Sequence, residues 1–324
     1  MIAGPKMRIV IPGGTGQLGT LLARAFLADQ HDVVVLSRHP VSAPWRSVGW
    51  DARTIGPWTS ELESADVVIN LAGRSVNCRY TPSNRRAILE SRVASARVVG
   101  QAIARCTRPP AVWLQASTAT IYAHRFDAPN DEATGVIGGN EPDAPASWRF
   151  SIEVARAWEA ATREIPLSST RLVLLRSAMV MSADAGGIFA TLLRLSRLGL
   201  GGSVAGGRQY VSWIHARDFV RVMYWLIEHH ELADAVNVAA PNPLPYREFM
   251  RGLRHAASVP IGLPATRWML AVGTWLLRTE SELVLKSRRV APGKLLRSGF
   301  RFDFPEWTAA AAELVGEASR RRSH

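Results

Sequence analysis

The feature that most constrains this chain is a glycine-rich turn between an apolar run and an amphipathic segment. The apolar run is 7–11 (MRIVI), and apolar residues recur at helical spacing over 18–27. Between them Gly13, Gly16 and Gly19 follow the pattern G-x-x-G-x-x-G. In a strand–turn–helix unit, such glycines let the backbone approach a pyrophosphate, and the free N–H groups of the helix N-terminus stabilise its charge. The sequence therefore predicts a dinucleotide site formed by Gly13, Thr15, Gly16, Gln17, Leu18 and Gly19.

The end of the next apolar run, 32–36, indicates which dinucleotide binds. Chains that bind the adenosine ribose of NAD usually have an acidic residue here. This chain has Ser37 and Arg38 instead. An arginine can pair with a 2′-phosphate through two hydrogen bonds, and the serine can add another. We therefore expect NADP(H) as the cofactor, the alternative being that Arg38 is an ordinary surface arginine.

Apolar runs alternate with amphipathic segments through the first half of the chain. Further strands are predicted over 65–71, 111–116 and 169–175, and helices over 83–105 and 150–163. This alternation predicts an α/β fold with a doubly wound, mostly parallel sheet. Past residue 177, glycine and proline breaks predict a smaller mixed lobe. The expected division is a dinucleotide-binding Rossmann domain over 7–176 with contributions from 204–240, a mostly substrate-binding lobe over 177–314 and a basic tail over 315–324.

The strongly basic balance of the chain bears on its partners. The net charge of +12 is compatible with nucleic acid, a membrane surface or an anionic ligand. Apart from the run 320–322, however, the arginines are scattered, which argues against nucleic-acid binding. The apolar stretch 268–277 is too short to span a bilayer and predicts a packed helix. We therefore expect a small-molecule partner rather than nucleic acid or a membrane.

Compartment and metal content follow from a few residues. Residues 1–6 lack the apolar stretch of a secretory leader, and Cys78 and Cys106 lack CxxC spacing. We expect inert thiols and a cytoplasmic protein. The acidic residues Asp127, Asp131 and Glu132 lack the order of a metal-ligand set, so no metal is expected.

Further motifs resemble those of the short-chain dehydrogenase/reductase superfamily. Residues 70–73 (NLAG) match its N-x-A-G turn, and 212–215 (SWIH) with 289–304 resemble late motifs of its atypical, epimerase-family subgroup. The resemblance covers about 7–314. It implies an NAD-dependent epimerase/dehydratase-like protein, and a homodimer through the helix at 83–105. It also implies cofactor contacts from Leu71, Ala72, Gly73, Ser91 and Arg176.

The catalytic pattern of that superfamily is absent from this chain. Redox members carry Tyr-x-x-x-Lys, in which the tyrosine transfers a proton and the lysine lowers its pKa. Aligning Glu159 with the acid that usually follows places Ser151 at the tyrosine and Ala155 at the lysine. Neither side chain can replace the pair unaided, and we expect Ser151→Ala to do little. Two hypotheses remain open: an NADP(H)-dependent oxidoreductase or epimerase without this pair, and a non-catalytic NADP(H)-binding redox sensor or scaffold.

Hydroxyl groups after the strand at 111–116 are the alternative proton donors. Because ligands bind at the carboxyl ends of parallel strands, Ser117 and Thr118 are expected to reach a substrate. Tyr122 is the candidate replacement for the missing tyrosine. The alternatives are strand-end capping for Ser117 and Thr118, and packing for Tyr122. Residues expected to line a substrate pocket, with packing or helix capping as the alternative, are Trp148, Trp213 and His215, accompanied by Arg149 and Arg208.

Overall fold

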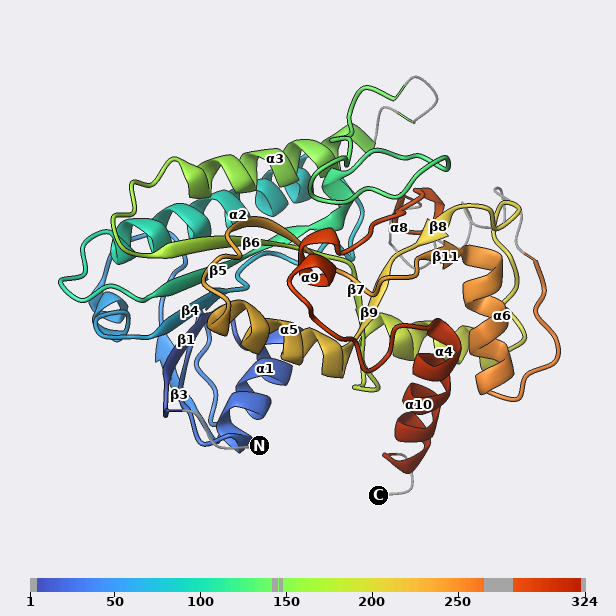
Figure 1. The fold of residues 1–324 in the computed structure, drawn as a ribbon, viewed down its shortest axis with the longest axis horizontal. Helices are drawn as coiled ribbons and strands as arrows, with labels where there is room; N and C mark the ends of the chain where they lie inside the picture. Colours follow the sequence, from blue (N-terminus) through green and yellow to red (C-terminus); the bar gives the residue numbers. More distant parts are fainter. Residues whose placement is uncertain (1–4, 142–144, 146–147, 265–281, 322–324) are drawn as a thin grey trace.

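A seven-stranded parallel sheet forms the centre of the molecule (Figure 1). The computed structural model describes residues 5–141, 145, 148–264 and 282–321. The strand order is β10-β6-β5-β4-β1-β2-β3. Successive strands are added on one side of β1 as far as β3 and then on its other side from β4 onward, which confirms the predicted doubly wound fold. A crevice at such a switch point is where ligands bind in sheets of this kind. The strands are β1 (Arg8–Pro12), β2 (Asp32–Ser37), β3 (Arg46–Gly49), β4 (Val67–Asn70), β5 (Val112–Thr118), β6 (Arg171–Ser177) and β10 (Asp234–Val238).

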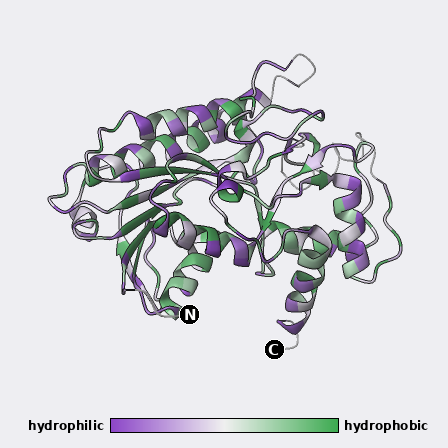
Figure 2. Ribbon diagram, viewed as in Figure 1, coloured by the Kyte–Doolittle hydropathy of each residue, from purple (hydrophilic) through white to green (hydrophobic). Residues whose placement is uncertain are grey.

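Helices cover both faces of this sheet. Helices α2 (Pro82–Ile103) and α3 (Arg149–Arg163) pack together on one face, and α1 (Gln17–Ala28) and α5 (Ala216–Glu228) pack on the other (Figure 1). Strands covered on both sides are apolar throughout. In β1, Ile9 and Ile11 belong to the core beneath α1 and α5, whereas Val10 belongs to the core beneath α2. Figure 2 shows the result, with hydrophobic central strands and helices of mixed polarity. Two 3-10 segments, η1 (Pro57–Glu61) and η2 (Ala119–Ile121), complete this layer.

Short elements after β6 build a smaller lobe beside the sheet (Figure 1). Strand β7 (Met179–Met181) pairs with β9 (Trp213–His215), and β8 (Tyr210–Val211) pairs with β11 (Leu244–Pro245). Although α5 and β10 lie within this stretch of sequence, they join the large sheet layer. The expected domain boundaries stay a prediction. The helices of the lobe are α4 (Ile188–Arg197), α6 (Tyr246–Ala256), α8 (Glu282–Leu285) and α10 (Trp307–Arg320). The short helix α9 (Gly293–Arg297) packs against β10 of the large sheet.

The end of the chain differs from the expected basic tail. Helix α10 continues to Arg320, because Leu314 and Val315 are buried against the lobe and Arg321 pairs with Asp184. The helix expected over 268–277 lies outside the described residues. Within the part of the chain that is described, no helix combines the length and apolarity that a membrane span requires.

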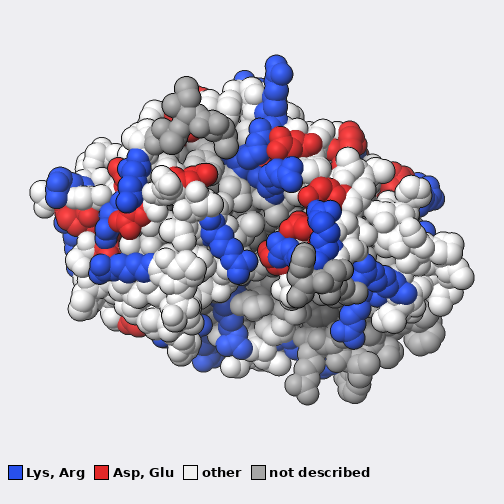
Figure 3. Space-filling model, turned by 90° about the horizontal axis from the view of Figure 1, so that it is seen from below, with Lys and Arg blue, Asp and Glu red and all other residues white. Residues whose placement is uncertain are grey.

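Basic side chains are spread over the surface. On the face shown in Figure 3, Lys and Arg side chains stand among Asp and Glu rather than in one continuous stripe. Several are paired, as Arg8 is with Asp32 and Glu61. The expectation that the chain does not bind nucleic acid stays a prediction that this distribution favours.

Candidate functional site

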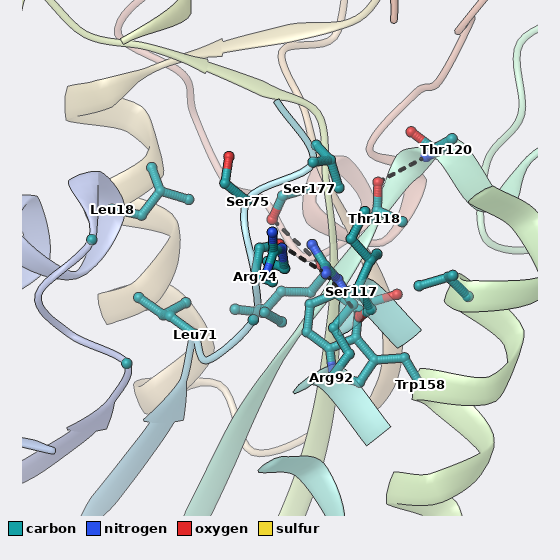
Figure 4. A pocket seen from close by; sticks show the side chains of 18 of the residues that line it. Leu18, Leu71, Arg74, Ser75, Arg92, Ser117, Thr118, Thr120, Trp158 and Ser177 are labelled. Carbon is teal, nitrogen blue, oxygen red and sulfur yellow. Dashed lines mark hydrogen bonds between the residues drawn. The ribbon is translucent and has the colours of Figure 1, made fainter. Parts of the chain in front are cut away.

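A cavity of about 540 Å³ lies at the carboxyl ends of the central strands. Its lining comes from the glycine turn before α1, the loop after β4, the ends of β5 and β6, and the inner sides of α2 and α3. Figure 4 shows Leu18 and Leu71 on one side, Ser117 and Thr118 on the other, and Arg74 between them. The cavity therefore connects the predicted phosphate loop with the predicted hydroxyl cluster.

The glycine turn has the geometry of a pyrophosphate cradle. Gly13 has φ +76°, and a Cβ there would lie 2.6 Å from the backbone of Ala72. A Cβ on Gly19 would lie 2.3 Å from Gly14 Cα, so this glycine permits close packing of α1 on the turn. Gly16 is the N-cap residue of α1, and no side chain caps this helix. The N–H groups of its first turn are thus available to an anion, and the turn fits a dinucleotide phosphate.

The end of β2 stands beside this turn. The Ser37 hydroxyl is buried, lies 3.3 Å from Thr15 Oγ1 and donates to the His39 carbonyl. Arg38 is exposed and forms no ion pair with any residue that the structure describes. Neither residue is part of the cavity lining, but the arginine is placed at the edge where a 2′-phosphate would be expected.

The turn after β4 is held by a buried amide. Asn70 Oδ1 accepts from Ala72 N at 3.1 Å, and its Nδ2 donates to Gln115 Oε1 at 2.8 Å. This pair keeps Leu71 and Gly73 in the cavity wall. Ser91 lies behind the wall, where its Oγ accepts from the backbone N–H of Arg74.

A buried polar network stands behind the hydroxyl cluster. Ser117 Oγ donates to Glu159 Oε1 at 2.7 Å, and Arg176 forms two 2.8 Å hydrogen bonds with the same carboxylate. Arg176 also donates to Tyr122 Oη, which donates to Asn237 Oδ1 at 2.9 Å. Burial alone would raise the pKa of Glu159, but its hydrogen bonds with Arg176 and Ser117 outweigh this and lower it. The Glu159 carboxylate is therefore an anion bound between Ser117, which lines the cavity, and Arg176 behind it.

Tyr122 and Arg176 are both bound within this network. Both were expected at the active or cofactor site, and neither lines the cavity. Burial raises the pKa of Tyr122, and its hydroxyl already has two partners. Arg176 is occupied by Glu159. The geometry favours a structural role for each, while Ser117 and Thr118 remain in the cavity wall.

The expected substrate residues lie elsewhere in the structure. Trp213 is fully buried and packs edge-on against Trp307. His215 caps α5 and its Nε2 is 2.9 Å from Glu313 Oε2, so both ring nitrogens are engaged. Trp148 is buried against the ring of His124 and lines a second, small cavity apart from the main one. Two further residues expected near a substrate are exposed outside the main cavity lining: Arg149 and Arg208.

Two arginines give the cavity wall a positive charge. Arg92 lies over the Trp158 ring at 5.1 Å, donates to the carbonyl of Arg74, and has its pKa lowered to about 10 by burial. Arg74 donates to Asn84 Oδ1. No described carboxylate forms an ion pair with either guanidinium. An anionic group on a ligand would therefore be favoured here.

A charged cluster behind Ser151 was not predicted from the sequence. Ser151 Oγ, in the cavity wall, donates to Glu282 Oε2 at 2.7 Å. Lys286 Nζ donates to the Thr120 carbonyl at 2.9 Å, and Arg288 Nε donates to Thr120 Oγ1 at 3.2 Å. These partners are separated by more than 130 residues in sequence, so no local pattern could have joined them.

Metal-binding groups are not gathered in the described chain. Within the described residues, no three His, Cys, Asp or Glu side chains come together as a metal site. Cys78 and Cys106 are both free thiols, and burial raises the pKa of Cys106.

Comparisons with known proteins show the family and the fold of the chain. Residues 9–239 match the family model described as the NAD dependent epimerase/dehydratase family, and 265–314 match a domain of unknown function. The chain is 32% identical to the epimerase family protein SDR39U1 of Bos taurus, over 95% of this chain and 100% of that protein. It is 30% identical to the epimerase family protein YfhF of Bacillus subtilis (strain 168), over 96% and 99%. Its structure is similar to that of human SDR39U1 (isoform 2) with NADPH, with a TM-score of 0.82, 28% identity and coverage of 96% and 99%.

Proposed function

The chain belongs to the NAD dependent epimerase/dehydratase family, which confirms the resemblance predicted from its motifs, and we propose that it is an NADP(H)-dependent oxidoreductase or epimerase acting on a small organic substrate. The observation that carries this proposal is the continuous cavity from the glycine turn to the hydroxyl groups of Ser117 and Thr118. A site that only stored a dinucleotide would not need a hydroxyl-lined, positively charged extension.

The choice of NADP(H) over NAD(H) rests on the end of β2. Arg38 stands exposed beside the glycine turn, with Ser37 in place of the acid that would bind an unphosphorylated ribose. The human relative solved with NADPH supports the same choice.

The chain's own groups would position the substrate and handle its proton. The bound cofactor would carry the hydride. Ser117 Oγ donates its hydrogen bond to Glu159, so toward a substrate it would act as an acceptor. Thr118 Oγ1 accepts from Thr120 N, and its own proton would be available to a substrate. Arg74 and Arg92 would hold a carboxylate or phosphate of the substrate. An anionic carbonyl compound or alcohol fits this set of donors.

The alternative is a non-catalytic NADP(H)-binding sensor or scaffold. It is favoured by α3, which presents Ser151 and the fully buried Ala155 where the tyrosine and lysine pair is expected. The two functions are separated by following NADPH absorbance across a panel of aldehydes, ketones, enones and quinones that includes carboxylated members. Turnover of any member supports the enzyme. Tight NADPH binding with no turnover across the panel supports the sensor.

Cofactor preference tests the proposal directly. In calorimetry the parent protein should bind NADPH at least about tenfold more tightly than NADH, because charge-assisted hydrogen bonds contribute about 1.5–3 kcal/mol each. Arg38→Ala should remove most of this preference and leave NADH binding within about twofold. Arg108→Ala is the matched control, since that exposed arginine precedes β5 and so lies at the amino ends of the strands, away from the cavity. Equal affinity of the parent for both cofactors would refute the choice of NADP(H).

A further inference from the structure

The Ser151 hydroxyl connects the cavity to a buried acid. Ser151 lines the cavity from α3, at the place where the missing tyrosine would stand. Its Oγ donates to Glu282 Oε2 at 2.7 Å, and Glu282 is only 3% exposed. A carboxylate buried beside the hydroxyl of a cavity residue can accept the proton that this hydroxyl gives up. Ser151 is thus assisted by an acid that the sequence places 131 residues away.

A buried lysine stands next to this acid. Lys286 Nζ lies 3.9 Å from Glu282 Oε1 and donates to the carbonyl of Thr120, itself a cavity residue. The chain has 39 basic residues, of which only Lys6, Lys286 and Lys294 are lysines. Arginine keeps its proton when buried, whereas a buried lysine can lose it near neutral pH. A lysine at this one buried position is therefore a chemically distinct choice in an arginine-rich chain.

We propose that Ser151, Glu282 and Lys286 form a proton relay in place of the missing tyrosine and lysine, with both ionisable groups supplied by the C-terminal segment. The proposal rests on the proposed function and gives that segment, matched as a domain of unknown function, a part in it. Ser151 is the catalytic residue, and Glu282 and Lys286 are positioning residues that act through it.

The proton path balances in both directions. When a substrate alcohol is oxidised, the hydride on its carbon would pass to the oxidised nicotinamide cofactor of the proposed function, which is reduced. The O–H bond of the alcohol breaks and a new Ser151 Oγ–H bond forms, while the original Ser151 proton moves to Glu282 Oε2. The carboxylate becomes a neutral acid, and one proton has passed from substrate to Glu282. Reduction of a carbonyl runs the same transfers in reverse. The ammonium of Lys286 stabilises the carboxylate form of Glu282 between turnovers.

The charges around Lys286 come from several elements. Burial lowers the pKa of Lys286 to about 8; Glu282 and Glu141 oppose this shift, and Arg288 adds to it. His124 also faces the group, and burial together with Lys286 lowers the pKa of that histidine. Because the folded value lies below the ordinary 10.5, Lys286 is charged below about pH 8 and neutral above it.

Lysine NMR tests the relay without cofactor or substrate. In protein labelled with ¹³C-lysine, three signals are expected, and Lys286→Arg assigns one of them. Lys286 should titrate near pH 8, well below the ordinary lysine value of 10.5, because it is buried. Glu282→Gln should lower its midpoint by a further half unit or about that much, because the carboxylate favours the charged form. A Lys286 midpoint at the ordinary value of 10.5, or one unmoved by Glu282→Gln, overturns the relay.

Turnover supplies the second readout. With a substrate from the panel, Ser151→Ala and Glu282→Gln should each lower kcat about 100-fold, the usual range for a lost proton-transfer group. Affinity for NADPH should remain within about twofold, since neither residue contacts the phosphate loop. Lys286→Met should remove a step near pH 8 from the pH profile of kcat. Lys294→Met, which removes an ammonium that donates to the Ala233 carbonyl outside the cavity, is the matched control and should leave both quantities unchanged.

The possible failures are distinct from one another. Absence of NADPH binding in the parent contradicts the proposed function whatever the NMR result. Normal NADPH binding and turnover with an unchanged kcat in Ser151→Ala contradicts the relay and leaves the proposed function standing.

Discussion

Replacing Gly16 with valine is expected to abolish binding of NADPH and NADH while leaving the fold intact. Gly16 has φ −74°, which any residue adopts, and a Cβ there would meet nothing closer than the Gly13 carbonyl at 3.8 Å. The valine is therefore tolerated by the protein. Because Gly16 lines the cavity, its new side chain would occupy the space of the pyrophosphate. Calorimetry should show at least about a 100-fold weaker affinity, as expected when close backbone approach is blocked.

Gly19→Ala is the informative contrast. Its Cβ would lie 2.3 Å from Gly14 Cα, so the helix and turn must separate before the substitution fits. Overpacking of this kind costs about 1–3 kcal/mol. Thermal denaturation should therefore separate the two variants, with Gly16→Val near the parent and Gly19→Ala clearly lower. Normal cofactor binding by a folded Gly16→Val variant would show that the dinucleotide binds elsewhere.

The glycine turn is the part of the site that the sequence predicts best. The glycine turn, the strand before it and the helix after it are contiguous, so local spacing carries the whole geometry. The same holds for residues 70–73, where a short motif places Leu71 and Gly73 in the cavity wall. The alternation of apolar runs and amphipathic segments likewise predicts the doubly wound sheet, because each unit is a local strand and helix.

Whether the other candidate residues reach the cavity depends on the direction of their side chains, which is set by packing. Tyr122, Trp213 and His215 were chosen for the chemistry of their side chains, yet the structure engages each with buried neighbours away from the cavity. Ser151 was set aside because serine alone is a weak acid. Its partner Glu282 comes from a segment 131 residues later, so only the folded chain reveals the contact.

Removing Glu159 is expected to cause the largest loss of stability. Its carboxylate is 3% exposed and receives hydrogen bonds from Ser117 and from the guanidinium of Arg176. Glu159→Ala leaves the buried Arg176 charge without this partner, and breaking a buried pair in this way costs about 3–5 kcal/mol. The free energy of unfolding from urea titration measures the loss. Removing both charges in Glu159→Leu/Arg176→Leu should recover part of it, because no isolated charge then remains buried.

Arg163 provides the matched control for this prediction. Its guanidinium lies 3.2 Å from the same carboxylate but is 43% exposed and also pairs with Asp234. Arg163→Ala should therefore cost less than about 1 kcal/mol, as exposed ion pairs do. A loss as large as that of Glu159→Ala would mean that the carboxylate is held by Arg163 rather than by Arg176.

The pH dependence of the same variant gives an independent check. The folded pKa of Glu159 is lowered from its ordinary value of 4.5, so the unfolded state binds more protons at acid pH. Its stabilising contribution is therefore fully present above about pH 4.5 and is lost as the pH falls through the folded value. The parent should lose stability over this window, and Glu159→Ala should show a shallower slope there. Equal slopes in the two proteins would mean that Glu159 is not held as an anion in the native state. The hydrogen bonds behind Ser117 would then involve a neutral carboxylic acid.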